Sequence, residues 1–229
     1  MNKLAGIKAV VFDLYGTLYN VHSVAQRCDE AAPGRGMEVS VLWRQKQLEY
    51  SWLRSLMGQT ISFEQATRDA LAFVSAHFKL ELDTAAMETL CDAYLNLSPY
   101  PEVPDALRKL QEMKLPMAIL SNGSDFSISK VVGGSGLQSF FSHLLSVDAV
   151  GVFKPDSRVY ALAGKAFSLA PEEMLFVSSN AWDAAGAAHY GFTVCWINRS
   201  GNTFDELGIS PAVVVGGLDE VPGLLLNGA

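Results

Sequence analysis

The sequence predicts an α/β protein with a doubly wound, Rossmann-like parallel sheet and an inserted helical cap subdomain. From about residue 101 onward, short apolar strands alternate with helices, which is the pattern of repeated βα units. Residues 23–97 instead have helical patterns with little strand character, and they directly follow one apolar run. We therefore expect a catalytic core formed by residues 1–20 and 98–229 and a cap formed by residues 21–97.

The first apolar run, residues 10–18, is the first expected strand, and it is interrupted by an acid. It reads Val-Val-Phe-Asp-Leu-Tyr-Gly-Thr-Leu, so Asp13 follows the strand and Gly16 lies in the turn after it. In an open parallel sheet the carboxyl ends of the strands face the ligand crevice. Asp13 is therefore a candidate nucleophile, although an aspartate before a glycine turn can also simply cap that turn.

Three helices are expected in the cap. One covers residues 40–58, the next begins at Ser62 with Gln65 three residues later as a capping box, and the third covers residues 83–96. On the first of these helices Arg44 heads an otherwise apolar face. A buried cation on such a face needs an anion, unless its side chain extends to solvent.

Alternating strands and helices are expected after the cap. The apolar runs predict strands over residues 117–122, 144–147, 174–179, 193–197 and 212–215. The intervening patterns predict helices over residues 104–113, 125–132, 156–167 and 183–190. Gly191 ends the last of these helices, and the glycine-rich segment 133–136 breaks the second. That segment is not a phosphate loop, because it lacks a Lys-Ser/Thr pair and a preceding strand.

Composition excludes several classes of function. The 229 residues suffice for one α/β domain with an insertion, and the net charge is −7 with scattered basic residues, so no nucleic-acid partner is expected. The N-terminal apolar run is interrupted by Asp13, so we expect neither a signal peptide nor a membrane span. We therefore expect a cytoplasmic location. Three widely spaced cysteines indicate structural thiols in a reducing compartment.

Four motifs, in this order, resemble those of the haloacid dehalogenase superfamily, and the resemblance covers essentially the whole chain. They are the segment around Asp13, Ser121-Asn122-Gly123, the segment from Lys154 to Tyr160, and the segment from Ser178 to Asp183. Phosphatases of the superfamily carry a second acid two residues after the nucleophile, where this chain has Tyr15. An aromatic residue there is similar to the (S)-2-haloacid dehalogenase family, also called L-2-haloacid dehalogenases.

The resemblance implies hydrolysis of (S)-2-haloalkanoic acids to (R)-2-hydroxy acids, with inversion, through an ester of Asp13. Loss of the second acid fits this chemistry, because a halide ion leaves without a proton whereas an alkoxide needs a general acid. Tyr15 can equally be a core-filling aromatic residue. No metal or other cofactor is expected, because Asp183 is the only acid in the fourth motif and a Mg²⁺ site would need more carboxylates.

The same resemblance assigns roles to other residues. Arg44 would receive the halide, and Ser121 and Asn122 would hold the substrate carboxylate. Lys154 would favour the charged form of Asp13, and Asp183 would help water attack the ester. The further catalytic candidates are Thr17, Ser178 and Asn180. The further substrate-binding candidates are Tyr15, Gln45, Leu48, Phe63, Tyr160 and Trp182.

Each of these assignments has an ordinary alternative. A serine and asparagine before a glycine form common turns, a lysine before a helix is usually solvent-exposed, and Asp183 can be a helix N-cap. Aromatic and leucine side chains can belong to the core. Expected partners are a small 2-haloalkanoate, a halide ion and a second copy in a homodimer, for which Trp52, Leu53, Leu56 and Met57 could form a contact surface unless they are buried. A Mg²⁺-dependent phosphatase or phosphonatase of the same fold, or a non-catalytic binding protein, remains an alternative function.

Overall fold

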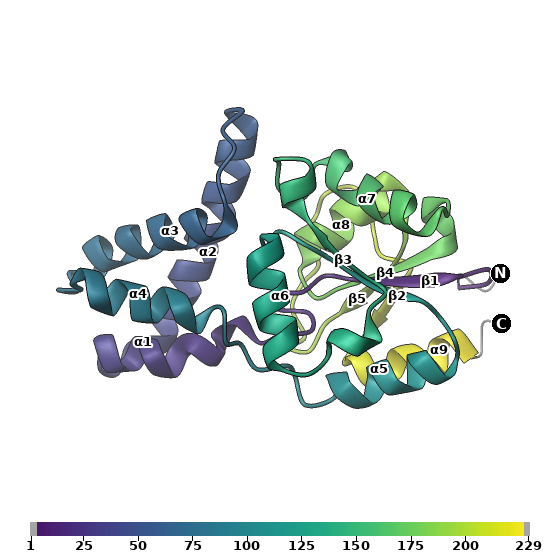
Figure 1. The fold of residues 1–229 in the computed structure, drawn as a ribbon, viewed down its shortest axis with the longest axis horizontal. Coiled ribbons are helices and arrows are strands. Elements are labelled where there is room, and N and C mark those ends of the chain that lie inside the picture. The colour runs from purple at the N-terminus through teal and green to yellow at the C-terminus, as the bar shows by residue number, and fades with distance from the viewer. Residues whose placement is uncertain (1–3, 227–229) are drawn as a thin grey trace.

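The computed structural model describes residues 4–226 and contains a parallel sheet covered by helices, with a group of helices beside it (Figure 1). Residues 1–3 and 227–229, which the predicted core includes, lie outside the described residues. The sheet has six strands, all parallel, in the order β3-β2-β1-β4-β5-β6. The doubly wound α/β prediction is confirmed. The strands are β1 (Ala9–Phe12), β2 (Met117–Ser121), β3 (His143–Ser146), β4 (Met174–Ser178), β5 (Thr193–Ile197) and β6 (Val213–Val215).

The strand order reverses at the centre of the sheet. From β1 the chain builds β2 and β3 on one side and then crosses to β4, β5 and β6 on the other. Phe12, the last residue of β1, is in register with Ile119 of β2 and Val177 of β4. Asp13 therefore emerges between the carboxyl ends of two neighbouring strands, at the switch point where open α/β sheets bind ligands.

Helices cover both faces of the sheet. In Figure 1, α7 (Ser157–Phe167) and α8 (Ala181–Tyr190) lie on one side and α5 (Val103–Glu112) and α9 (Val221–Leu226) on the other. Every residue of β1, β2 and β4 is buried. Burial on both faces explains why these strands are continuous apolar runs in the sequence rather than alternating patterns.

Four helices lie beside the sheet, and α6 (Asp125–Gly134) lies between them and the strands in Figure 1. They are α1 (Ala25–Ala31), α2 (Gly36–Leu56), α3 (Phe63–Phe78) and α4 (Thr84–Ala93). The chain enters and leaves this group through adjacent segments: Asn20 N–H donates to the Ser98 carbonyl at 3.0 Å, and Tyr100 N–H to the Leu18 carbonyl at 3.0 Å. We propose that residues 21–97 form a cap subdomain inserted at this point.

Tertiary packing moves several element boundaries from their predicted positions. The helix expected at residue 40 begins at Gly36, where a Cβ atom would lie 2.4 Å from the Ala25 carbonyl, so the close approach of α1 requires a glycine. The helix break predicted at residues 133–136 begins later than expected, because α6 continues to Gly134. The third cap helix ends at Ala93 instead of residue 96.

At the N-terminus of α3, one of the two hydrogen bonds of the predicted capping box is present. Ser62 Oγ accepts a hydrogen bond from Gln65 N–H at 3.1 Å, as expected for an N-cap. The side chain of Gln65 does not return to Ser62 but donates to Asp69 at 2.7 Å. One backbone donor is therefore satisfied instead of the two of a full capping box.

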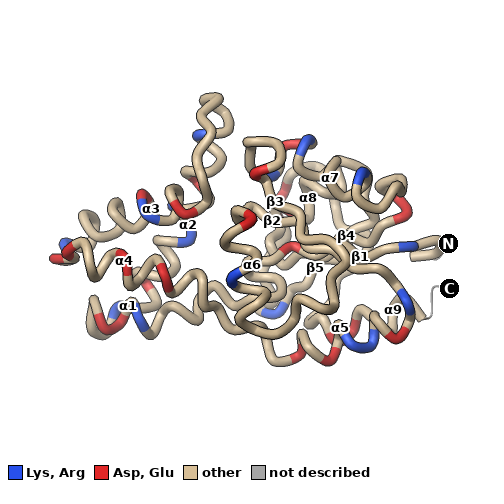
Figure 2. Tube along the Cα trace, viewed as in Figure 1, with Lys and Arg blue, Asp and Glu red and all other residues tan. Residues whose placement is uncertain are grey.

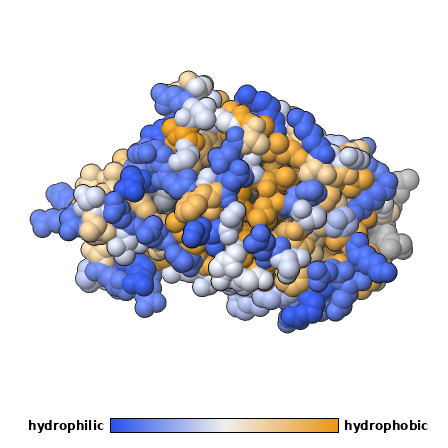
Figure 3. Space-filling view, in the orientation of Figure 1, coloured by the Kyte–Doolittle hydropathy of each residue, from blue (hydrophilic) through white to orange (hydrophobic). Residues whose placement is uncertain are grey.

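The surface has mixed charge and carries exposed apolar side chains. Lysine and arginine residues are interspersed with acidic residues along the chain (Figure 2), and apolar residues gather in the middle of the face shown in Figure 3. No helix among residues 4–226 is long and apolar enough to cross a membrane. Leu53, Leu56 and Met57 at the end of α2 are exposed, Leu56 by 84%, so core burial is the wrong interpretation for these three; Trp52 is partly buried.

Candidate active site

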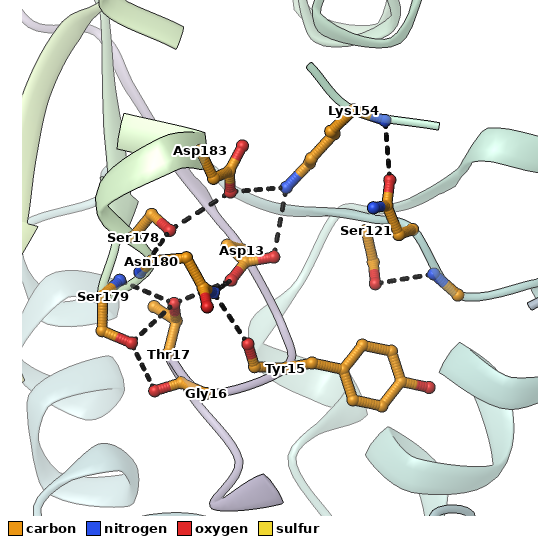
Figure 4. Close-up of polar contacts among 12 residues, drawn as sticks. Asp13, Tyr15, Gly16, Thr17, Ser121, Lys154, Ser178, Ser179, Asn180 and Asp183 are labelled. Atoms are coloured by element: carbon orange, nitrogen blue, oxygen red, sulfur yellow. Dashed lines mark hydrogen bonds and ion pairs between the residues drawn. The ribbon is translucent and has the colours of Figure 1, made fainter. Parts of the chain in front are cut away.

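Asp13 is held at the carboxyl end of β1 by donors to both of its carboxylate oxygens (Figure 4). Oδ2 accepts hydrogen bonds from Thr17 Oγ1 at 2.8 Å and Asn180 Nδ2 at 2.7 Å. Oδ1 accepts one from Lys154 Nζ at 3.1 Å. The residue is only 5% exposed. Within residues 4–226 no backbone N–H of the following turn binds this carboxylate, so Asp13 does not act as the turn cap considered above.

The turn after Asp13 places Thr17 against the end of β4. Gly16 has φ +87°, which favours glycine, and its N–H donates to the Tyr19 carbonyl at 2.7 Å. Thr17 Oγ1 in turn accepts a hydrogen bond from Ser179 N–H at 2.9 Å. Arg199, which the sequence did not single out, donates to the Thr17 carbonyl at 2.9 Å and fastens the turn from the other side. No motif pointed to Arg199, because its role depends on the return of a distant loop.

Lys154 is completely buried and bridges Asp13 and Asp183, with Nζ 2.9 Å from Asp183 Oδ2. Burial alone would lower the pKa of Lys154, but the two carboxylates together raise it above its usual value, so the ammonium stays charged. A solvent-exposed Lys154 is therefore the wrong interpretation. The helix predicted to begin at residue 156 begins at Ser157, because Asp156 is its N-cap and accepts from Arg158 N–H at 2.9 Å.

Asp183 is fully buried at the second end of this bridge. Its Oδ1 accepts from the Tyr160 hydroxyl at 2.7 Å, and its Oδ2 accepts from Ser178 Oγ at 3.1 Å as well as from Lys154. Burial raises the pKa of Asp183 to about 6, and the Lys154 ammonium opposes this shift. The alternative of Asp183 as a helix N-cap is wrong, because Asn180 occupies that position of α8.

Arg44 enters the site from α2 of the cap. It is 9% exposed, its Nη1 donates to Gln47 Oε1 at 2.7 Å, and its guanidinium carbon lies 6.0 Å from the centroid of the Tyr15 ring. The side chain therefore points inward, and the alternative that it extends to solvent is wrong. Gln47 also donates to Thr67 Oγ1 at 2.5 Å, so it fixes Arg44 to α3. Gln45, expected to bind substrate, is exposed instead.

Helix spacing is the one feature of the sequence that indicates a role for Gln47. Residues three apart lie on the same face of a helix, so a glutamine at this spacing after a buried Arg44 is a natural partner for the guanidinium.

Aromatic pairs connect the cap with the core on two sides of the site. Tyr15 stacks on Phe63 with ring centroids 4.9 Å apart, and both are buried. Trp182 meets Trp52 edge to face at 5.2 Å, and both are partly buried, as is Leu48 on α2. The structure thus places Tyr15 and Phe63 together, and Trp182 at a second junction between α8 and α2. Apolar walls of this kind exclude water from a reacting centre.

The turn after β2 presents one free donor. Asn122 Oδ1 accepts from Lys154 N–H at 2.8 Å, but the buried Asn122 Nδ2 has no hydrogen-bond partner among the described residues. A buried donor left unpaired costs about 1–3 kcal/mol and suits an anionic ligand that would accept from it. Ser121 Oγ, fully buried, accepts from Gly123 N–H at 3.0 Å. A Cβ atom at Gly123 would lie 3.1 Å from the Tyr15 ring, which explains the glycine.

The acids of the site do not form a cluster that suits a metal ion. Asp13 and Asp183 both bind the ammonium of Lys154, so a cation already lies between them. In the part of the chain that the structure describes, no group of three or more His, Cys, Asp or Glu side chains could hold a metal.

Comparisons with known proteins agree with this geometry. The family model of haloacid dehalogenase-like hydrolases matches residues 7–191. The (S)-2-haloacid dehalogenase of Pseudomonas sp. strain YL is 61% identical over 205 residues, covering 90% of this chain and 88% of that protein. The (S)-2-haloacid dehalogenase 2 of Pseudomonas sp. strain CBS-3 is 58% identical, covering 96% of each. The structure of L-2-haloacid dehalogenase from Xanthobacter autotrophicus with chloropropionic acid covalently bound has a TM-score of 0.92 and 39% identity, covering 97% of this chain and 100% of that chain.

Proposed function

The chain belongs to the haloacid dehalogenase-like hydrolase family, and we propose that it is an (S)-2-haloacid dehalogenase. It hydrolyses (S)-2-haloalkanoic acids to (R)-2-hydroxy acids, with Asp13 as the nucleophile and without a metal or other cofactor. The observation that carries this proposal is the environment of Asp13: three donors hold its carboxylate, and Tyr15 stands where a phosphatase would have its proton donor. The relatives support a dehalogenase and not the phosphatase alternative.

The first step forms the ester. Oδ1 of Asp13, whose one hydrogen bond from the described residues is the longer one from Lys154, attacks C2 of the substrate from the side opposite the halogen. The C2–O bond forms as the carbon–halogen bond breaks, which inverts the centre. The halide leaves toward Arg44 and the unpaired Nδ2 of Asn122. Ser121 and Asn122 hold the substrate carboxylate, and Phe63, Leu48 and Trp182 surround its alkyl group.

The second step hydrolyses the ester. Water attacks Cγ of Asp13 and gives a proton to Asp183, whose Oδ1 accepts one hydrogen bond from the described residues, that of Tyr160, and can accept another. Negative charge develops on Oδ2, where the donors Thr17 and Asn180 already lie at 2.8 and 2.7 Å and stabilise it. The C–O bond to the product breaks, the product alkoxide takes the proton, and Asp13 is restored. Lys154, Ser178 and Tyr160 hold Asp183 in place.

A single turnover in oxygen-18 water tests the ester route. We expect the label in the Asp13 carboxylate and an unlabelled hydroxyl in the first product molecule, measured by mass spectrometry. Label in that first product would contradict the covalent route and favour direct attack by water. Asp13→Asn should release no halide at all.

Chloride release from L-2-chloropropionate tests the activity itself. We expect release that is selective against the D-enantiomer, resists EDTA and yields D-lactate. Release that requires added Mg²⁺ would contradict the cofactor-free mechanism. A protein that binds the haloacid without turnover would instead be the non-catalytic binding protein considered above.

Two further proposals concern the protein in the cell. The exposed apolar group at Leu53, Leu56 and Met57 supports a homodimer, since such side chains gain by burial in an interface. Light scattering should give twice the chain mass of 24.8 kDa, and a Leu56→Lys variant should lower that value. The three free cysteines support a cytoplasmic location, where thiols stay reduced; fractionation of cells tests this.

A further inference from the structure

Tyr94, at the end of α4, has a buried hydroxyl without a partner. The residue is 3% exposed, and among the described residues nothing forms a hydrogen bond with its hydroxyl oxygen. Its ring is held edge to face against Trp43 at a centroid distance of 4.7 Å, and the Trp43 indole N–H donates to the Thr67 carbonyl at 2.8 Å. The ring is therefore firmly placed while its polar atom is unused. Phenylalanine would fill the same space without burying an unpaired hydroxyl.

The hydroxyl lies in the neighbourhood of Arg44. Tyr94 and Arg44 lie close enough for each to affect the pKa of the other, and Trp43, on which the Tyr94 ring packs, directly precedes Arg44 on α2. Tyr94 also lines a cavity of about 230 Å³ together with Tyr15, Phe63 and Thr67. The unpaired hydroxyl thus lies on the cap side of the proposed site, as does Arg44, which is proposed to receive the leaving halide.

We propose that the Tyr94 hydroxyl donates a hydrogen bond to the halide ion that Arg44 receives, as a third donor beside Asn122. The inference rests on the proposed dehalogenase function and adds a residue to it. A halide accepts hydrogen bonds and offers no proton, so it needs several converging donors. Unpaired donors that are already in place stabilise charge as it develops on the leaving halogen without having to reorganise.

The hydroxyl keeps its proton in the working range of pH. Burial raises the pKa of Tyr94 well above its usual value, although the Arg44 guanidinium opposes the shift. The group is therefore a neutral donor at neutral pH. The Arg44 guanidinium nearby is also a donor, and an anion shared between the two satisfies both.

Tyr94→Phe removes only the oxygen and tests the proposal. We expect kcat/KM for 2-chloropropionate to fall about five- to tenfold, the effect of one hydrogen bond. The fall should be smaller for 2-bromopropionate and 2-iodopropionate, because larger halides accept weaker hydrogen bonds, so the bromide-to-chloride rate ratio should rise. The Tm should stay the same or rise, since an unpaired buried hydroxyl is lost. Loss of rate through misfolding would lower the Tm instead.

Tyr50→Phe is the matched control, because Tyr50 is a partly buried tyrosine on α2 of the same cap that the mechanism does not use. It should leave the rate ratio unchanged. Chloride binding, followed by chlorine-35 NMR line broadening, tests the hydroxyl without turnover: we expect weaker binding by Tyr94→Phe than by the wild type or the control. Equal chloride affinity and an equal rate ratio in all three proteins would overturn the inference. Absence of halide release by the wild type would contradict the proposed function separately.

Discussion

Replacing Lys154 with methionine should destabilise the protein in a pH-dependent way. Methionine keeps the length and apolar character of the lysine stem but removes the ammonium that lies 3.1 Å from Asp13 Oδ1 and 2.9 Å from Asp183 Oδ2. Two buried carboxylates would then lose the ammonium that lies between them. Exposed Lys165 on α7, the helix that follows Lys154, provides the control Lys165→Met, which should change the stability by no more than about 0.5 kcal/mol.

The size of the effect follows from these distances. At about 3 Å and an effective dielectric constant of about 20, each ammonium–carboxylate contact is worth roughly 5 kcal/mol before the cost of desolvation. Removing one member of a buried ion pair typically costs about 3–5 kcal/mol, because the remaining charge is uncompensated. We expect a loss in this range at pH 8, together with loss of halide release.

The pH dependence distinguishes charge from packing. In the unfolded chain Asp183 titrates near pH 4. In the folded variant the buried Asp183 carboxyl, without its ammonium partner, holds its proton to higher pH, so folding takes up a proton and the stability deficit grows as the pH rises from about 4. Urea unfolding at pH 8 and pH 5 should therefore give a larger difference from the wild type at pH 8. Equal differences at both values would refute the reasoning and attribute the loss to packing.

Three further predictions concern activity. Because burial raises the pKa of Asp183 to about 6, ester hydrolysis should slow as the pH falls below 6. Mass spectrometry of acid-quenched protein should then find more ester on the protein during turnover at pH 5 than at pH 8. An unchanged ester level would exclude Asp183 as the base. Gln47→Leu should raise KM for the haloacid about tenfold by releasing Arg44, and an unaltered KM would contradict its positioning role. Asn122→Asp keeps the acceptor for Lys154 N–H but loses the unpaired donor, so kcat/KM should fall about a hundredfold while the circular-dichroism melting curve is retained.

The position of the nucleophile could be predicted from the sequence because strand ends obey a simple geometric rule. Asp13 follows an apolar run, and parallel strands bring all their carboxyl ends to one edge of the sheet. The same rule brings Ser121 and Ser178 to that edge. The contact of Lys154 with Asp13 was expected only through the family resemblance, because a lysine in a loop has no periodic signature, and its contact with Asp183 was not predicted.

Contacts within and around the cap could not be predicted from the sequence. Gln47 donates to Thr67, which is distant in the chain, and the Tyr94 hydroxyl has no partner among the described residues; neither residue belongs to a motif. The start of α2 at Gly36 depends on how closely α1 approaches, which no local propensity encodes. Gly133 remains helical because Ile128, Val131 and Val132 of α6 are buried against the core, although glycine disfavours helices.

The paired segments at Leu18–Asn20 and Ser98–Tyr100 have an evolutionary consequence. Because the chain leaves and re-enters the core at adjacent points, everything between them is topologically a single long loop. Long insertions in such loops cost little free energy, since closure entropy grows only slowly with length. In the proposed function, the cap residues that meet the halide and the alkyl chain, such as Arg44 and Phe63, can therefore change by exchange of this insertion, while Asp13 and the rest of the core are retained. Substrate range and reaction chemistry are separately variable in this architecture.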